Sequence, residues 1–287
     1  RVSSSITSVD IESVGVIRVV PEDEEQISTL LDYGNKSLEY LSFAVGTGLY
    51  PDRIQFYQDL DEQPLDAYLT IFDYSADRSP SKADYLFRPE YADFETTLRN
   101  WIEHCENAPE VHENYRLLLH RSNLAPQLRF LTAVIALEAY YDSEHEDETL
   151  MPEEEFDEIQ SEIMDVVPAE EDLQAQIYGL LDNVANTPSI KDKLVTLMES
   201  EQDLIGNFFN ISDLASKARK QRNEAAHGSS EATPIEFNIL SEKLCLVLEA
   251  ILARRLGVPT EVLLDTLGSR HRGLADLVDL AEDQTEE

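Results

Sequence analysis

A basic segment late in the chain carries the side chains whose types and spacing could do chemistry. Residues 216–228 read SKARKQRNEAAHG, in a chain of 287 residues whose formal net charge is −36. The polar side chains of interest in this segment are Lys217, Arg219, Lys220, Arg222, Asn223 and His227. Cations concentrated within two helical turns of so acidic a chain indicate a binding site for an anion.

These residue types fit the cleavage of a phosphodiester. His227 could take the proton from a ribose 2′-OH or supply one to the leaving 5′ oxygen. Arg222 could hold the phosphate and stabilise transition-state charge, while Asn223 orients phosphate or imidazole by hydrogen bonding. Three neighbours could bind the RNA backbone regardless of sequence: Lys217, Arg219 and Lys220. Internal 2′-OH attack needs no metal or other cofactor, leaves a 2′,3′-cyclic phosphate and spares DNA.

The same segment is typical of the end of a helix. Its Ala, Lys and Arg residues propagate a helix, Asp213 is a candidate N-cap, and Gly228 is a candidate left-handed residue after the last turn. Arg222 and His227 are five residues apart and therefore point roughly 140° apart on an ideal helix, whereas Asn223 and His227 share a face. Two copies of the helix end could enclose one phosphate, so we expect a composite site in a homodimer.

A long apolar helix is expected to support this segment. From Tyr91 onward the hydrophobic period is helical, and Pro126–Tyr141 is apolar on nearly all sides. Glu138 is the exception there, and a buried carboxylate needs a cationic or hydrogen-bonded partner. Arg222 and Arg219 are the first candidates. Glu138 could support the site, hold two helices in register, or do both.

The fold class expected is mainly α, with two parts. Residues 1–88 form a small α+β region, and residues 89–287 form a helical bundle that ends in an acidic tail. In the first part we expect a helix over 27–45 broken near Gly34 and Asn35, with strands at Val14–Val20, Arg53–Gln58 and Ala67–Tyr74. In the second we expect acidic helices at Glu155–Val166 and Glu170–Leu181, a long helix at Ile235–Leu256, short helices at Thr260–Leu267 and Leu274–Leu280, and a solvated basic loop at Arg270–Arg272.

The segment from Arg222 to His227 resembles the signature of the HEPN superfamily, an Arg and a polar residue followed by a His. The trailing Ala-His-Gly is similar to the ApeA-like branch, and the resemblance extends over Tyr91–Leu256. It implies a dimeric helical domain, a metal-independent RNase acting in toxin–antitoxin or antiviral defence, and an antitoxin or regulatory partner protein. It also implies that Glu138 supports the motif helix and that residues 1–88 are a recognition or regulatory part.

Composition adds further expectations. The chain has 58 acidic against 22 basic residues, spread over every segment, which is typical of a halophilic protein with a solvated carboxylate surface. Cys105 and Cys245 lie in apolar helical patterns and match no metal-ligand spacing, which favours buried free thiols and a cytoplasmic location. No apolar run is long enough for a membrane span, and the start of the chain does not read as a signal peptide.

Three classes of function stay open on this reading. The first is a HEPN-type endoribonuclease. The second is a catalytically inactive HEPN module that binds RNA or a partner protein. The third is an acidic nucleic-acid mimic or a purely structural subunit. Replacing His227 or Arg222 with Ala separates the first two classes, because only an RNase would lose cleavage while keeping its fold.

Overall fold

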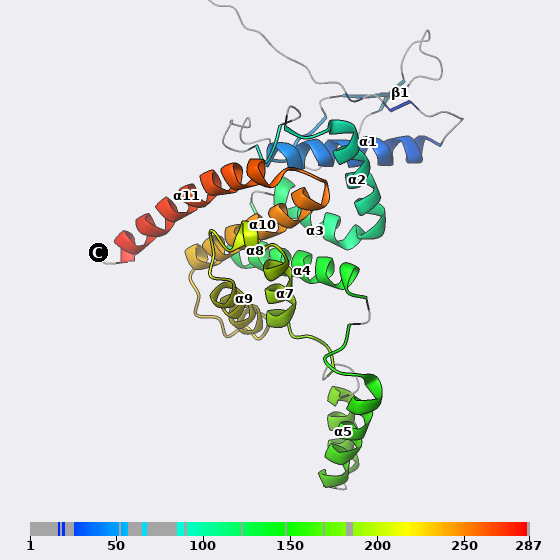
Figure 1. Cartoon of the computed structure of the whole chain (residues 1–287), viewed down its shortest axis with the longest axis vertical. Coiled ribbons are helices and arrows are strands. Elements are labelled where there is room, and N and C mark those ends of the chain that lie inside the picture. The colour runs from blue at the N-terminus through cyan, green and yellow to red at the C-terminus, as the bar shows by residue number, and fades with distance from the viewer. Residues whose placement is uncertain are drawn as a thin grey trace, which may run out of the picture.

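The computed structural model describes most of the chain and is predominantly helical. The described residues are 17, 19–20, 26–51, 53–56, 65–67, 85–88, 91–121, 123–146, 148–168, 170–181 and 186–285. Within them the chain forms eleven helices and one two-stranded sheet (Figure 1). The expectation of a mainly α fold is confirmed.

The first part contains one helix and one small sheet. Helix α1 spans Ile27–Val45, and strands β1 (Ile54–Phe56) and β2 (Leu65–Ala67) pair antiparallel, with Ile54 opposite Ala67. Strand β1 lies within the predicted range 53–58, of which residues 57–58 lie outside the described part, and β2 ends where the other predicted strand begins. Residues 68–74 lie outside the described part, and the described residues of 14–20 are not in a strand.

The predicted break in the first helix was wrong. Helix α1 runs continuously through Gly34 and Asn35. A helical glycine costs only about 1 kcal/mol relative to alanine, and tertiary packing offsets this. Here Tyr40 and Phe43 are buried, and the ring of Phe43 stacks on Trp101 at 5.0 Å between centroids. Helix α1 therefore packs into the same hydrophobic core as the helices that follow it.

The helices of the body surround one apolar core. They are α2 (Phe94–Asn107), α3 (Pro109–His120), α4 (Pro126–Glu144), α7 (Ile190–Ser200), α8 (Gln202–Ile205), α9 (Ile211–Ala226), α10 (Pro234–Arg255) and α11 (Thr260–Thr285). Two further helices, α5 (Glu153–Val166) and α6 (Glu171–Leu180), form a hairpin that projects from the body between α4 and α7 (Figure 1).

Helices α4 and α10 are the centre of the body. The ring centroids of Phe130, near the start of α4, and Phe237, near the start of α10, are 5.4 Å apart. At the other end of the two helices, Glu144 of α4 forms an ion pair with Arg255 of α10 at 3.0 Å. The two helices therefore run side by side in the same direction. Most side chains of α10 and the majority of the apolar side chains of α4 are buried between the other helices, as expected for the apolar helix from Pro126.

The end of the chain differs from the prediction. A single helix, α11, replaces the two short helices, and Arg270 is not in a solvated loop. Its side chain turns inward to form an ion pair with Glu249 of α10, which also accepts a hydrogen bond from the Tyr115 hydroxyl at 3.0 Å. Helix α11 continues through Gly268, where the ring of Phe208 lies close to the backbone.

Both cysteines are buried free thiols, as expected, and burial raises the pKa of each to about 12. A membrane-spanning helix needs about 20 mostly apolar residues in succession, and none of the helices in the described part of the chain meets this requirement.

Candidate functional site

Helix α9 positions the basic segment, and its two ends are defined by local hydrogen bonds. The N-cap is Asn210, whose side chain accepts from the backbone N–H of Asp213 at 3.0 Å, so the prediction of Asp213 as the N-cap was wrong. At the other end His227 is the C-cap and Gly228 has φ +67°, as predicted for a left-handed residue. The N–H of Ser229 closes the end on the carbonyl of Glu224 at 2.9 Å.

One face of α9 is fixed in the core and the other is open to solvent. Ile211, Leu214, Ala215 and Ala218 are buried at helical spacing, and the helix packs against α7 and α4. Lys217, Arg219 and Lys220 are exposed on the remaining surface. The sequence pattern thus predicts which side chains of this helix a ligand can reach.

Some of these cations are partly neutralised by their own helix. Lys217 pairs with Asp213 at 2.9 Å, and Lys220 lies 3.7 Å from Glu224. In the described part of the chain, the guanidinium of Arg219 has neither an ion pair nor a hydrogen bond. Among the described residues, the exposed surface of α9 therefore offers one guanidinium without a partner and two lysines whose surface ion pairs are weak and easily replaced by a ligand.

The three residues predicted to carry the chemistry lie together at the C-terminal end of α9. Arg222 is half-buried, whereas Asn223 and His227 are exposed. Among the described residues, none of these three side chains forms a hydrogen bond or an ion pair. The backbone N–H of His227 donates to the carbonyl of Asn223 at 3.1 Å, which fixes the two residues one turn apart. Polar side chains without protein partners are available to a ligand.

Glu138 of α4 lies close to this end of α9. It is half-buried, and its desolvation raises its pKa, while the positive charges of Arg222 and Lys193 oppose that rise. Arg222 was a predicted partner, but Arg219 does not contribute and Lys193 of α7 was not anticipated. Lys193 pairs directly with Asp142 at 2.5 Å. Glu138 interacts with Arg222 through space, without an ion pair within 4.0 Å.

Lys243 extends the basic surface, and the sequence analysis missed it. This half-buried residue of α10 has a pKa lowered by burial and by the positive charge of Lys217, with Asp213 opposing. The lowering by Lys217 places the two ammonium groups within electrostatic reach of each other. The sequence feature that could have indicated Lys243 as part of the basic surface is that it is the one lysine in a largely buried, apolar helix.

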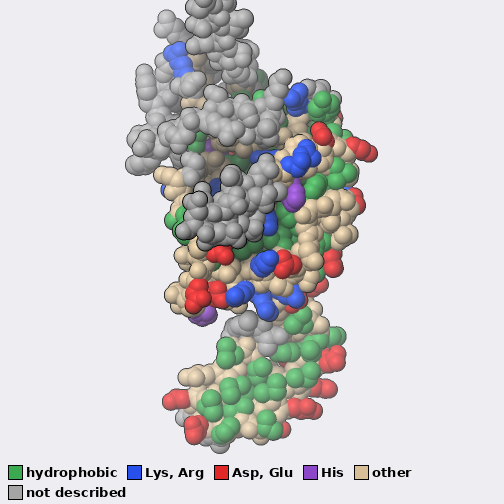
Figure 2. All heavy atoms as spheres, turned by 90° about the vertical axis from the view of Figure 1, so that its left-hand side faces the viewer, with side chains coloured by type: hydrophobic (Ala, Val, Ile, Leu, Met, Phe, Trp, Pro, Cys, Tyr) green, Lys and Arg blue, Asp and Glu red, His purple; other side chains and the backbone are tan. Residues whose placement is uncertain are grey.

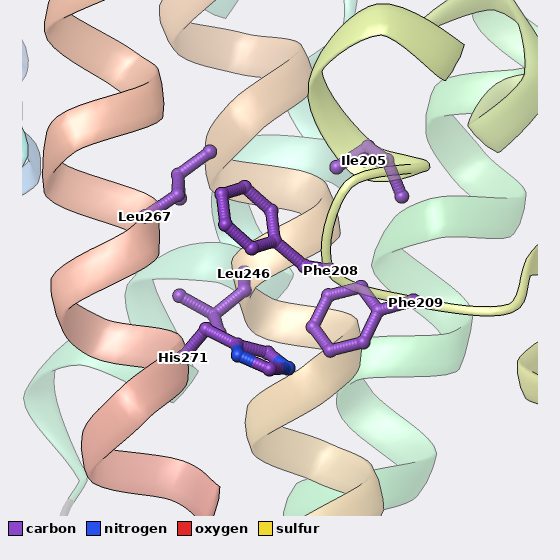
Figure 3. Close-up of a pocket in the computed structure, with 6 residues that line it drawn as sticks. All are labelled: Ile205, Phe208, Phe209, Leu246, Leu267 and His271. Atoms are coloured by element: carbon purple, nitrogen blue, oxygen red, sulfur yellow. The ribbon is translucent and has the colours of Figure 1, made fainter.

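The second basic spot of the sequence has a packing role. The ring of His271 lies 5.5 Å from that of Phe208 and 5.3 Å from that of Phe209. These rings line a small apolar pocket between α8, α10 and α11 that has no room for a water molecule (Figure 3). With its guanidinium bound to Glu249, Arg270 is not available to an anionic ligand.

The described residues contain no group of three or more His, Cys, Asp or Glu side chains that could hold a metal ion. On the molecular surface, Lys and Arg side chains alternate with carboxylates at the end of the body nearest the hairpin (Figure 2).

Comparison with known proteins identifies the domain that contains this site. A family model described as Apea-like HEPN matches residues 131–262, a range that includes Glu138 and the whole of α9. No curated protein and no solved structure matches the chain. The match supports an Apea-like HEPN domain over residues 131–262 of this chain.

Proposed function

We propose that the protein is a metal-independent endoribonuclease with Arg222, Asn223 and His227 as catalytic residues. The observation that carries the proposal is a set of three polar side chains at one helix end within the HEPN match that have no hydrogen bond or ion pair among the described residues. His227 removes the 2′-OH proton or protonates the 5′ oxygen as the P–O5′ bond breaks. Arg222 binds the scissile phosphate, and the nearby Glu138 supports the motif helix by its charge.

Four cations on two helices form the proposed RNA-binding surface. Lys217, Arg219 and Lys220 of α9 would bind phosphates, and Lys243 of α10 would add a contact beside Lys217. Three of the four are exposed, and the chain is otherwise strongly acidic. Long-range attraction of RNA is therefore weak, and short contacts at this surface must supply most of the affinity.

The proposed active site is completed by a second copy of the chain. Arg222 and His227 point in different directions from one helix, so one copy alone does not enclose a phosphate. Helix α4 exposes Leu128 and Ile135, which are 51% and 49% accessible and lead along the helix to Glu138. Pairing of two such stripes would bring two α9 ends to one groove, with a guanidinium from one copy and an imidazole from the other.

The direct test is cleavage of total RNA and of tRNA in about 1 M KCl with EDTA. We expect wild type to cleave, leaving 2′,3′-cyclic phosphates and sparing DNA of the same sequence. His227→Ala should lower the rate by about 10²–10⁴-fold and Arg222→Ala by about 10²–10³-fold. His145→Ala is the matched control, because His145 is the C-cap of α4 as His227 is of α9.

Three results would count against the assignment. These are undiminished cleavage by His227→Ala, a requirement for a divalent metal, and binding of RNA by wild type without any cleavage. The last result would identify a HEPN module that binds RNA and has lost catalysis. Cleavage that is lost equally in His145→Ala would point to damage of the fold instead of a catalytic role.

On the resemblance to defence HEPN proteins, we propose that this activity serves a toxin or antiviral system and is restrained until needed. The restraint would come from a partner protein or from residues 1–88.

A further inference from the structure

The hairpin formed by α5 and α6 lies outside the packed body. Helix α5 has no buried side chain, and the two helices pack mainly against each other. The base of the hairpin is closed by hydrogen bonds across its two connections. The N–H of Leu150 donates to the carbonyl of Asn186 at 3.0 Å, and the Asn186 side chain bonds both the N–H and the carbonyl of Met151 at 3.1 Å. The hairpin is therefore a defined projection with its own base.

One side of this projection is apolar and faces solvent. On α5, Ile159, Ile163 and Val166 share a face by their spacing and are 38%, 36% and 81% accessible. Helix α6 also exposes Tyr178 and Leu180, which are 50% and 65% accessible and, two residues apart, project from different sides of that helix. Figure 2 shows apolar side chains gathered over this part of the molecule, with carboxylates along the margins. Contiguous apolar surface with a polar margin is typical of a protein-binding site.

The margin of this surface carries charge of one sign only. The chain has no Lys or Arg between Arg129 and Lys191. Helix α5 carries acidic residues along its whole length, and α6 begins with a further group of them. The exposed carboxylates of the hairpin are Glu153, Glu154, Glu155, Asp157, Glu158, Glu162, Asp165, Glu170 and Asp172. The surface therefore requires an occupant with apolar side chains at its centre and cations at its edge.

A second copy of the chain does not meet both requirements. Two hairpins packed face to face would bring two wholly acidic margins together. The basic helix α9 of a second copy would supply cations, but none of its large hydrophobic side chains is exposed. A basic amphipathic helix meets both requirements, because its apolar stripe is flanked by Lys and Arg.

We propose that the apolar face of the α5–α6 hairpin is the docking site for a separate protein that presents a basic amphipathic helix. Apolar side chains of that helix cover Ile159, Ile163 and Val166, and its cations pair with the carboxylates at the margin. The site is separate from α9, so docking and RNA cleavage can be measured independently.

The test uses the full chain and a fluorescent peptide of about 18 residues with Leu and Lys at amphipathic helical spacing. Binding is measured by anisotropy in about 1 M KCl, where general attraction of a polycation to the acidic chain is screened to about 3 Å. A peptide with each Leu replaced by Ser keeps the charge and lacks the stripe. We expect wild type to bind the Leu/Lys peptide and to bind the Ser/Lys peptide at least about tenfold more weakly.

Two hairpin variants and one matched control test whether the peptide binds at the apolar face of the hairpin. I159S/I163S/V166S should weaken Leu/Lys peptide binding at least about tenfold, and E158Q/E162Q/D165N should weaken it less, through the margin alone. I27S/Y91S removes exposed apolar side chains of similar accessibility elsewhere and should bind as wild type does. Circular dichroism checks the helix content of each, and the Gln/Asn variant keeps the test valid should the Ser variant lose its fold.

The proposal is overturned by unchanged binding to both hairpin variants, or by equal binding of the Ser/Lys peptide to wild type. It is also overturned if sedimentation shows that I159S/I163S/V166S converts a dimer to a monomer, since the occupant would then be a second copy.

Discussion

Two glutamates in apolar helices have different environments, and the difference separates a structural carboxylate from a candidate functional one. Glu249 of α10 is buried with a direct ion pair to Arg270 and a hydrogen bond from Tyr115. Glu138 of α4 is half-buried and interacts with Arg222 only at a distance. Desolvation raises the pKa of both. Glu138 thus leaves the guanidinium of Arg222 available to a phosphate, whereas Glu249 occupies that of Arg270.

Replacing Arg270 should severely destabilise the fold. Arg270→Met leaves the buried Glu249 without its cation, and breaking such a pair typically costs about 3–5 kcal/mol. Arg272→Met, two residues away and exposed, is the control and should change the free energy of unfolding by less than about 0.5 kcal/mol. Urea denaturation of both variants at neutral pH measures the difference. Equal stability of the two variants would contradict the role given to Arg270.

The loss of unfolding free energy caused by Arg270→Met should become smaller as pH falls. Desolvation raises the pKa of Glu249 above its ordinary value of 4.5, and Arg270 opposes that rise, so removing Arg270 raises the folded-state pKa further. Below that pKa the folded variant binds a proton that the unfolded chain does not yet bind, and its stability recovers relative to wild type. We expect a smaller difference at about pH 5 than at pH 7, with no such change for Arg272→Met.

At the scale of single residues, the sequence predicts the motif but only part of its surroundings. Arg222, Asn223 and His227 are identifiable because cations are rare in this chain and adjacent in sequence. The charge of Lys193 acts on Glu138 from α7, Lys243 of α10 lies within reach of the charge of Lys217, and Arg270 turns inward to a carboxylate 21 residues away. Such contacts depend on the packing of helices, which spacing along one helix does not determine.

At the scale of elements, the left-handed residue that ends helix α9 contributes to stability. Substitution of this glycine and of one inside a helix tests that contribution. Gly228 has φ +67°, whereas Gly34 lies inside α1, and an added Cβ would meet nothing within 4 Å at either position. Gly228→Ala should therefore destabilise by roughly 1 kcal/mol through the left-handed backbone alone. Gly34→Ala should stabilise by roughly 0.5–1 kcal/mol. Thermal unfolding of the two variants should shift in opposite directions, and shifts of the same sign would contradict the argument.

Helices were predictable where local sequence determines their ends. Ser189 caps α7 through a reciprocal pair of hydrogen bonds with Asp192, and Pro126 and Pro234 occupy the first turns of α4 and α10. The continuity of α1 through Gly34 and of α11 through Gly268 was not predictable, because burial of neighbouring side chains overrides weak local preference. The first strand was predicted within one residue of its observed start, whereas β2 precedes all but the first residue of the second predicted strand, because pairing with β1 determines which residues join the sheet.

The state of assembly belongs to the scale of the whole molecule. L128S/I135S should convert the proposed homodimer to a monomer and abolish RNA cleavage, because the exposed stripe on α4 would no longer pair. Sedimentation velocity in about 1 M KCl measures the first effect and the RNA assay measures the second. His227→Ala should remain dimeric. A monomeric wild type that cleaves RNA would exclude the composite site.

Net charge should make the fold dependent on salt. With a formal charge of −36, repulsion among carboxylates favours the expanded chain. Raising KCl from about 0.1 M to about 1 M shortens the screening length from about 10 Å to about 3 Å. The free energy of unfolding in urea should therefore rise over this range. A flat or falling dependence would show that hydrated carboxylates do not repel one another enough to affect folding.

The hydrogen bonds between Asn186 and residues 150–151 bring the two connections of the hairpin to within bonding distance of each other. The chain thus leaves the bundle and returns to it at two neighbouring points. The hairpin could therefore be deleted, or replaced by an unrelated sequence whose ends lie equally close, without changing the distance that the connection from α4 to α7 must span. Evolution could therefore change what this protein associates with as a cassette, leaving the architecture around α9 untouched.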